Sequence, residues 1–495
     1  MLHVSKKARN MIFLLIAMIS IAALISVLLT AAFSPLRIRT EQPPEFCSHH
    51  FWSMPTTGYS ISCGLSTGND GYILAGRLVD FQNNSSSEPF IDQINKTDFS
   101  KKIPVIKILP YYDFKIQMNV SPYSINDIYK TKDKGYIAVG KALAGNGTQS
   151  YFYMAKMNQS LVPEPDWERA YSPGEGLSVI QTSDLGYVAV GCSYDNNGNA
   201  NHYIVKTDQY GNIKWHYPLG RPGKYTVVKQ LKDGSIVTGG YAIYRGCSHV
   251  SGTIIAFNTK GCPLPCVPGS SSNASWGMGP HEMDLSINDL TESSDHNIWA
   301  VGAAKQDNNH SSGWLLKVNS SVITRQLSGT AQIPFPNGTL EMFYKFNNNS
   351  YNNFTFINRT NDGGFIIGGQ TGNGSSSNAI NSILLLKIDR EGKILWAQSY
   401  KLDRLLEYDT CSRLGSVQQI DDDKYFFAAT NYDSNSDFWN DSNGAIWGAL
   451  LNPSETQLPD ILGFVGAYIF QIITALAAIT AMTLGVLNYR QTRRQ

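Results

Sequence analysis

Charged residues are scarce in this sequence. They make up 16% of the 495 residues, and 40 Lys and Arg against 39 Asp and Glu leave a net charge of +1. In soluble domains, charged residues usually make up roughly a quarter of the chain. Without a surplus of positive charge the chain has no electrostatic footprint for nucleic acid, so we expect no such partner. Asn, Ser, Thr, Gln and Gly supply the polarity instead, which is typical of extracellular glycoproteins.

The short motifs of common enzymes are also missing. The sequence has no H-E-x-x-H zinc motif, no phosphate-binding P-loop and no dinucleotide-binding G-x-G-x-x-G. We also expect no nucleophile elbow of a hydrolase. The 9 His are spread over different segments. No catalytic residue and no cofactor is therefore predicted. An enzyme acting on glycans or small molecules stays open as an alternative, because residues from several repeats can meet at one site.

Two long runs without charge, residues 11–33 and 461–487, enclose the rest of the chain. Each is long enough to cross roughly 30 Å of hydrocarbon as a helix. Their positive flanks are Lys6, Lys7 and Arg9 before the first run and Arg490, Arg493 and Arg494 after the second. Positive flanks stay in the cytoplasm, so the sequence predicts two membrane spans with the region between them outside the cell. A cleaved signal peptide is the competing interpretation of the first run.

Potential N-glycosylation sites fit this topology, because all of them lie between the two runs. The N-x-S/T sequons begin at Asn83, Asn84, Asn95, Asn119, Asn146, Asn158, Asn273, Asn309, Asn319, Asn337, Asn348, Asn353, Asn358, Asn373 and Asn440. Chance occurrence in an Asn- and Ser-rich chain accounts for some of them. We nevertheless expect a heavily N-glycosylated external region.

The cysteines also lie in the predicted external region, where disulfides can form. They are Cys47, Cys63, Cys192, Cys247, Cys262, Cys266 and Cys411. Cys262 and Cys266 are the expected local pair. The odd number leaves at least one thiol free or paired between chains.

A motif that recurs along the chain predicts the fold. A strand-like segment follows an acidic turn and ends in a small residue, with copies at NDGYILAG (from Asn69), DKGYIAVG (from Asp133), DLGYVAVG (from Asp184), DGSIVTGG (from Asp233), DHNIWAVG (from Asp295), DGGFIIGG (from Asp362) and DDKYFFAA (from Asp422). Corresponding residues are 49 to 67 positions apart. A second strand, a Lys-x-Asp turn and a third strand ending in Trp follow the best copies. Seven such units are typical of a β-propeller with four-stranded blades.

The pattern DGGYIxxG followed by KxDxxGxxxW resembles the repeat of bacterial and archaeal cell-surface β-propellers. The resemblance covers roughly residues 55–452. It implies an all-β, seven-bladed β-propeller ectodomain between N- and C-terminal transmembrane helices. The predicted parts are a cytoplasmic tail (1–10), a signal-anchor helix (11–33), a linker (34–54), the propeller (55–457), a second helix (461–487) and a cytoplasmic tail (488–495).

Three groups of residues could carry chemistry. Asp433, Asn435, Asp437 and Asp441 alternate in a long loop and could bind calcium, although Phe438 replaces the usual glycine. Cys47, His49 and His50 are close in sequence and could bind a metal, although a linker is the simpler explanation. The segment from Asp389 to Trp396 is similar to the tryptophan-docking motif of quinoprotein dehydrogenases. That similarity implies packing between blades and not cofactor binding.

These observations predict a non-enzymatic surface protein. We expect a membrane-anchored, glycosylated propeller that acts in binding, in adhesion or as a structural subunit. Its expected partners are the lipid bilayer and other surface proteins or glycans. Loops between the second and third strands of each unit are long, and ligands are expected on that face. An accessory subunit of a membrane complex is a further alternative.

Overall fold

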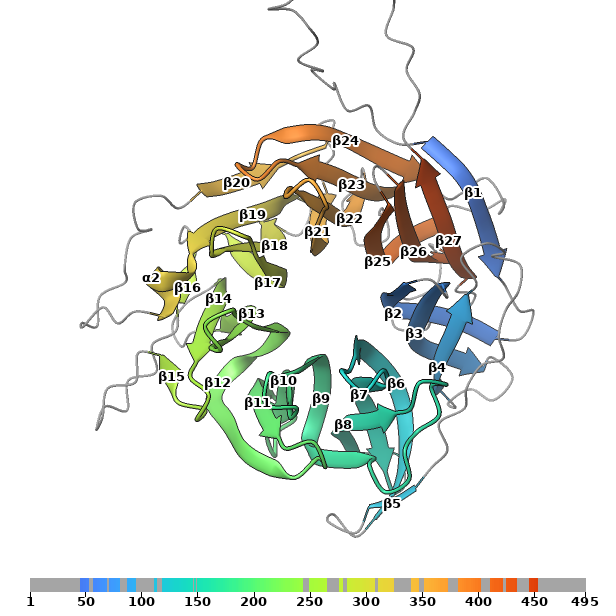
Figure 1. The fold of residues 1–495 in the computed structure, drawn as a ribbon, viewed down its shortest axis with the longest axis vertical. Helices are drawn as coiled ribbons and strands as arrows, with labels where there is room; N and C mark the ends of the chain where they lie inside the picture. The colour runs from blue at the N-terminus through green and yellow to red at the C-terminus, as the bar shows by residue number, and fades with distance from the viewer. Residues whose placement is uncertain are drawn as a thin grey trace, which may run out of the picture. The chain divides into compact units, whose positions relative to one another are not determined.

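The computed structural model describes much of the chain between Glu45 and Asn452, and this part consists almost entirely of antiparallel β-strands (Figure 1). The described residues are 45–52, 57–68, 71–80, 87–94, 111–113, 118–145, 147, 149–243, 249–264, 276–278, 283–307, 310–324, 340–346, 351–372, 382–401, 410–421, 424–433 and 445–452. A short helix, α2 (Ser320–Thr324), lies among them. The expected all-β class is confirmed, and the arrangement is propeller-like.

Each copy of the repeated motif forms a strand with an antiparallel partner on both sides. These motif strands are β3 (Gly71–Asp80), β7 (Tyr136–Ala144), β10 (Tyr187–Tyr194), β13 (Ile236–Ile243), β18 (Asn297–Lys305), β22 (Phe365–Gly372) and β26 (Lys424–Asp433). The strand before each one lies nearest the common axis in Figure 1 and is called an inner strand. The inner strands are β2 (Thr57–Gly68), β6 (Met118–Lys130), β9 (Arg169–Gln181), β12 (Ile213–Gln230), β17 (Asp284–Glu292), β21 (Tyr351–Arg359) and β25 (Thr410–Asp421).

The remaining strands complete each group away from the axis. The third strands are β4 (Ser87–Ile94), β8 (Gln149–Met157), β11 (Ala200–Thr207), β14 (Val250–Phe257), β19 (Ser311–Asn319), β23 (Ser382–Ile388) and β27 (Ala445–Asn452). Further strands are β1 (Glu45–Trp52), β5 (Tyr111–Asp113), β15 (Pro263–Leu264), β16 (Trp276–Met278), β20 (Leu340–Tyr344) and β24 (Ile394–Lys401). The strands β9 and β12 are long because each pairs with one group at its start and the next group at its end.

A β-bulge explains the glycine of the motif. Every inner strand carries one extra residue opposite this position: Ser62, Asn126, Leu177, Thr226, Asn288, Thr355 or Gly415. The bulge brings a backbone carbonyl close to the motif strand. A Cβ on Gly140 would lie 1.9 Å from the carbonyl oxygen of Ser124, and a Cβ on Gly302 would lie 1.8 Å from that of Ser286. Glycine is therefore required for close backbone approach. The least regular copy has Ala429 at this position.

The acidic turn of the motif is held by a lysine from the third strand. Lys387 is 1% exposed, and its ammonium contacts the Asp362 carboxylate at 2.6 Å and the Thr360 hydroxyl at 2.7 Å. The pairs Lys206–Asp184 and Lys156–Asp133 repeat the arrangement at 2.9 Å and 2.8 Å. The Lys-x-Asp element of the sequence thus binds the turn that begins the motif strand.

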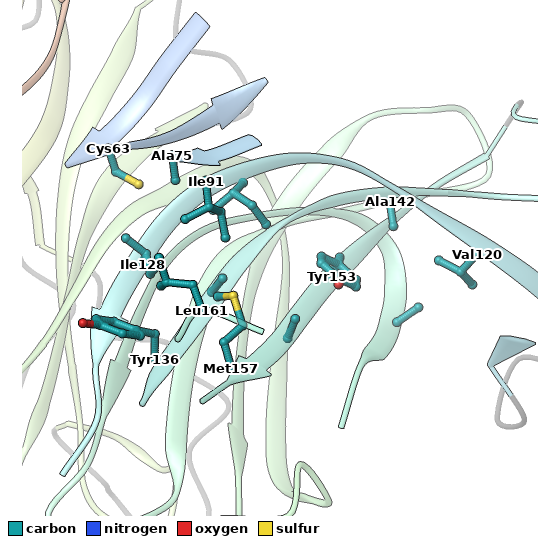
Figure 2. Packing of buried hydrophobic residues seen from close by; sticks show 14 of the residues in the cluster. Cys63, Ala75, Ile91, Val120, Ile128, Tyr136, Ala142, Tyr153, Met157 and Leu161 are labelled. Carbon is teal, nitrogen blue, oxygen red and sulfur yellow. The ribbon is translucent and has the colours of Figure 1, made fainter. Parts of the chain in front are cut away.

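Apolar side chains fill the space between successive groups. Figure 2 shows one such cluster, in which Cys63, Ala75 and Ile91 of the first group face Ile128 and other side chains of the second. Similar clusters join each later group to the next. Full burial of a Val, Ile, Leu or Phe side chain contributes about 1.5–3 kcal/mol. This packing between sheets is therefore the main source of stability.

The last group also packs against the first. The rings of Tyr72 in β3 and Phe426 in β26 stack with their centroids 3.8 Å apart. The backbone N–H of Ile61 donates to the Thr430 hydroxyl at 2.8 Å, and the Gln418 amide donates to the Gly64 carbonyl at 2.7 Å. β1 is the outermost strand of the last group, because it pairs with β27 from Glu45 opposite Asn452 to Trp52 opposite Ile446.

Two sequence-based boundaries change as a result. The expected linker, residues 34–54, contains β1, so the sheet begins at Glu45. The sequence places the first of the long loops between second and third strands at residues 77–89, but β3 continues to Asp80 and β4 begins at Ser87, so this loop is shorter. The predicted spans at 11–33 and 461–487 lie outside the described residues. No helix within the described ranges is long and apolar enough to cross a bilayer.

Candidate functional site

Contacts that recur from group to group stabilise the fold. A binding or catalytic site is expected where one group differs from the others. One recurring feature is a bond from the end of an inner strand to the acidic turn of the preceding group. The side-chain oxygens of Gln181, Gln230, Glu292 and Gln419 accept backbone N–H bonds from Lys132, Ser183, Lys232 and Asn361 at 2.7 to 2.9 Å. Sequence analysis missed this bond, although each acceptor stands three residues before the aspartate of its own motif copy.

Tryptophans provide a second recurring contact between groups. The indole N–H of Trp167 donates to the carbonyl of Gln209 at 2.8 Å, and that of Trp215 donates to Thr259 at 3.2 Å. Trp396 is 6% exposed and meets Tyr425 of the next group edge to face at 5.7 Å. The expectation that the Asp389–Trp396 segment serves packing is confirmed.

A cluster of Arg77, Tyr123 and Lys141 breaks the repeat. Arg77 Nη1 donates to the Tyr123 hydroxyl at 2.7 Å, and the guanidinium carbon lies 5.3 Å from the centre of the tyrosine ring. The Lys141 ammonium lies 5.2 Å from the same ring centre. All three side chains are half-buried. They come from β3, β6 and β7, at the end of these strands where the long loops between second and third strands begin.

The position of Tyr123 depends on a second bulge in β6. The register between β6 and β7 shifts between Pro122 and Ser124, in addition to the shift that all groups share. The corresponding parts of the other inner strands pair regularly with their motif strands over the described residues. A bulge re-aims a side chain and is common beside functional sites.

Polar side chains of β6 and of the inner strands in the next two groups contact one another. The Asn126 amide donates to the Glu175 carboxylate at 3.0 Å, and the other Glu175 oxygen lies 3.5 Å from the Lys224 ammonium. Burial would lower the pKa of Lys224, but the Glu175 carboxylate is the main cause that opposes it, and the pKa is raised to about 12. Lys224 therefore stays charged at any physiological pH.

Two largely buried carboxylates, Asp127 and Asp289, occupy the same repeat position on β6 and β17. Asp127 accepts bonds from the Ser178 hydroxyl at 2.9 Å and the Val179 N–H at 3.0 Å. Asp289 accepts the Ile357 N–H at 3.0 Å, and its other oxygen lies 3.9 Å from the Lys229 ammonium. Burial raises the pKa of both carboxyls. Each carboxylate binds the backbone of the following inner strand, so the pair joins groups and is not a catalytic dyad.

The predicted metal ligands are not tested by the structure. Asp433 ends β26, and Asn435, Asp437 and Asp441 lie outside the described residues. Cys47, His49 and His50 lie in β1, and their side chains are outside the description. No group of three His, Cys, Asp or Glu side chains in the described ranges is placed to hold a metal ion.

The predicted glycosylation sites divide into three sets. Asn119, Asn158 and Asn319 are exposed. Asn353 and Asn358 lie in the inner strand β21, where their amide nitrogens donate to Gln370 at 3.3 Å and to the Val417 carbonyl at 2.7 Å. An N-linked glycan needs this same nitrogen, so these two sequons serve the fold. The remaining predicted asparagines lie outside the described residues.

Two further sequence features involve potential nucleophiles. Cys63 and Cys192 are buried, and burial raises the pKa of both thiols, so neither is a reactive thiolate. Cys262 is partly buried between β14 and β15; because Cys266 lies outside the described residues, their pairing stays a prediction. Residues 64–68 match the pattern G-x-S-x-G of a hydrolase nucleophile elbow. They lie within β2 and not at a strand-to-helix turn, so they form no such elbow.

No protein-family model matches the sequence, and no curated protein matches it significantly. A solved protein of unknown function from Dyadobacter fermentans is 11% identical, with a TM-score of 0.40 over 66% of this chain and 93% of that one. A subtype N11 neuraminidase-like protein of a flat-faced bat influenza A virus is 11% identical, with a TM-score of 0.40 over 78% and 97%. Prolyl oligopeptidase B from Galerina marginata is 10% identical, with a TM-score of 0.40 over 84% and 52%. Similarity at this level carries no argument about function.

Proposed function

We propose that this chain is a seven-bladed β-propeller, displayed outside a membrane by two spanning helices, that acts as a binding or structural surface protein. Each motif strand with its neighbours corresponds to one blade, and β1 completes the last blade. The spans are residues 11–33 and 461–487, with both tails in the cytoplasm. Glycans attach at the exposed Asn119 and at other sequons whose nitrogens the fold does not use.

The pairing of β1 with β27 is the observation that supports this proposal. Glu45 lies opposite Asn452, so the chain enters and leaves the sheet at the same place. The connections to the apolar runs are residues 34–44 and 453–460, which reach at most roughly 40 Å and roughly 29 Å when extended. Two spans attached at one place can enter the same membrane side by side. An open array of repeats would separate its two ends.

The described side chains favour binding over catalysis. The carboxylates of Asp127 and Asp289 accept backbone hydrogen bonds and hold neighbouring strands together. By contrast, Arg77, Tyr123 and Lys141 present hydrogen-bond donors at the loop end of the inner strands. Loops carry binding functions more often than strands do, so side chains at the start of the loops suit recognition of a ligand.

Surface labelling of intact cells tests the proposal. The chain carries one epitope tag at each end, and a membrane-impermeant, amine-reactive biotin reagent is added before or after permeabilisation. We expect the protein to be biotinylated on intact cells, while antibodies reach both tags only after permeabilisation. Biotinylation that requires permeabilisation, or a tag exposed on intact cells, contradicts the topology. Native electrophoresis after gentle detergent extraction then separates a lone receptor from a subunit of a larger assembly.

A further inference from the structure

We infer that the second and third groups rest on the outer surface of the membrane, through exposed apolar side chains of their turns. These side chains lie on what we call the turn face, which comprises the acidic turns and the turns that follow the third strands. The inference rests on the proposed function, because it requires spans at residues 11–33 and 461–487. It adds which side of the displayed domain meets lipid.

Exposed apolar side chains gather on one part of the turn face. Within the described ranges, seven large apolar side chains are exposed. Five of them come from the turn end of the second and third groups and are 38 to 63% exposed: Tyr129, Val162, Leu185, Tyr210 and Ile213. Ile243 and Phe343 are the other two; Ile243 ends β13 at the loop end, and Phe343 lies in the outer strand β20.

Printed contacts join the turns that carry these five side chains. The Lys132 ammonium donates to the Ser183 carbonyl at 3.3 Å and so joins the acidic turns of the two groups. The Lys214 ammonium lies 3.2 Å from the Asp184 carboxylate and joins the two turns of the third group. The Trp167 indole donates at 2.8 Å to a carbonyl of the turn after β11. The exposed apolar side chains are therefore gathered on adjoining turns, as at an interaction surface.

Backbone strain shows that one of these side chains is displayed at a cost. The residue after the motif aspartate has a left-handed backbone, and in two copies it is glycine, Gly234 and Gly363. No atom lies within 4 Å of a Cβ built on either glycine. Lys134, Leu185 and His296 hold this position with φ of 68°, 67° and 60°. Such a backbone is unfavourable for a residue with a Cβ, and the exposed Leu185 gains little packing in return. Strain of this kind is common at functional positions.

The chain enters and leaves the described sheet at the turn face. Tyr425, at the start of β26, lies opposite Leu451, so the end of β27 lies beside the acidic turn of the last group. Glu45 lies opposite Asn452 at this same end. The short connections to the proposed spans therefore begin at the turn face. With both spans inserted, this face is the side of the domain turned toward the bilayer.

The side chains of the turn face suit the boundary between lipid headgroups and acyl chains. Tyrosine rings favour headgroup depth, and leucine, isoleucine and valine side chains favour the region just below it. Lys132 and Lys134 are exposed beside them and can reach lipid phosphates with their ammonium groups. The carboxylates of Asp133 and Asp184 pair with buried lysines of the third strands, which offsets their repulsion of phosphate.

Photo-crosslinking of the full-length protein in nanodiscs of phosphatidylcholine and phosphatidylglycerol tests this inference. The photoreactive residue p-benzoyl-phenylalanine replaces Leu185 or Tyr210 in separate variants. Ile243 is the matched control site, because it is 45% exposed but lies at the loop end of its strand. Mass spectrometry after irradiation should find lipid adducts at positions 185 and 210, and none above background at position 243.

The inference is overturned if positions 185 and 210 give no lipid adducts or if position 243 gives as many. Crosslinks between two copies in place of lipid adducts also overturn it, since the turn face would then join copies of the chain. Failure of the proposed function is seen separately: a chain without spans does not enter nanodiscs, and this is measured before irradiation.

Two substitutions separate membrane contact from folding. Leu185→Asp with Ile213→Asp should remove the adducts at position 210 and leave the thermal midpoint unchanged, while Ile243→Asp should leave the adducts in place. Leu185→Gly should raise the thermal midpoint in detergent, because glycine adopts the left-handed backbone without strain. A lower midpoint for Leu185→Gly would show that Leu185 serves the fold, and undiminished adducts in the double variant would show that these side chains do not hold the lipid.

Discussion

At the scale of single residues, buried lysines hold the turns that begin the motif strands. Lys387 is 1% exposed while its partner Asp362 is 46% exposed. The two members of the pair therefore contribute unequally. Removal of the carboxylate leaves a buried ammonium without its charge partner, whereas removal of the ammonium leaves a carboxylate that water can solvate. Sequence analysis found the Asp and the Lys as parts of one motif but gave no contact between them, because they belong to different strands.

We predict that Asp362→Ala lowers the free energy of unfolding by about 2–3 kcal/mol, while Lys387→Met lowers it by less than about 1 kcal/mol. Glu391→Gln is the control. Its partner Arg390 is 78% exposed, and such surface pairs contribute about 0–1 kcal/mol. Urea denaturation followed by tryptophan fluorescence measures all three. Equal losses at Asp362 and Lys387 would show that burial of the lysine does not determine how much each partner contributes to the free energy of unfolding.

Stability should be greatest at mildly acidic pH, because two sets of carboxyls have opposite pKa shifts. Burial alone would raise the pKa of Asp184, but hydrogen bonds from Thr182 and Lys206 outweigh it and hold the pKa below its usual range. Stability from this group is complete above the unfolded value of about 3.9 and is lost as the pH falls through the folded value. Burial raises the pKa of Asp127 and Asp289. Their ionisation therefore costs stability as the pH rises above about 3.9.

Thermal unfolding measured between about pH 3 and pH 8 tests this prediction. The unfolding midpoint of the native protein should pass through a maximum and fall on both sides. Asp127→Asn with Asp289→Asn should flatten the fall toward neutral pH, and Asp184→Asn should flatten the fall toward acid. A midpoint that rises steadily to neutral pH would contradict the assigned direction for the two buried carboxyls.

At the scale of strands, the sequence predicted the motif strands. It did not predict the contact that requires glycine at their end. The alternation of apolar residues and the final glycine indicated one strand in each copy. The reason for the glycine is a carbonyl of the neighbouring inner strand, and that strand has no comparably regular sequence. The second bulge, at Tyr123, gave no signal either. Tyr123 and Arg77 are 46 residues apart and meet only when two groups pack together.

The glycine requirement predicts a large effect of one added methyl group. Gly140→Ala should lower the free energy of unfolding by about 1–3 kcal/mol or more, since the new Cβ would lie 1.9 Å from the Ser124 carbonyl oxygen. Ala429→Gly is the matched control, because the last copy already accommodates a methyl group there. Its change should stay within about 1 kcal/mol. Similar losses for both variants would mean that the bulge opposite this position is not the reason for its glycine.

At the scale of the whole molecule, contacts between the first and last groups were beyond sequence analysis. The sequence indicated that a ring would bring its ends together, but residues 34–54 carried no repeat and were assigned to a linker. β1 has no copy of itself elsewhere in the chain. Its place beside β27 depends on the backbone edge that β27 offers, which any extended segment of sufficient length can meet.

Pairing of β1 should contribute measurably to the stability of the whole chain. Ser48 lies opposite Leu450 in this pair. Ser48→Pro places a residue with a fixed φ and no backbone N–H in this pairing and should lower the thermal midpoint by several degrees, as a loss of about 1–3 kcal/mol implies. Ser48→Ala keeps the N–H and should leave the midpoint nearly unchanged. Equal behaviour of the two variants would show that β1 does not close the last group.

Single-particle electron microscopy of the full-length protein in lipid nanodiscs tests the central proposal most directly. The account predicts seven blades around one axis, β1 as the outermost strand of the last blade, and two transmembrane helices leaving from the edge where Glu45 meets Asn452. An open array of blades, a different number of blades, or a particle without helices in the nanodisc would contradict it.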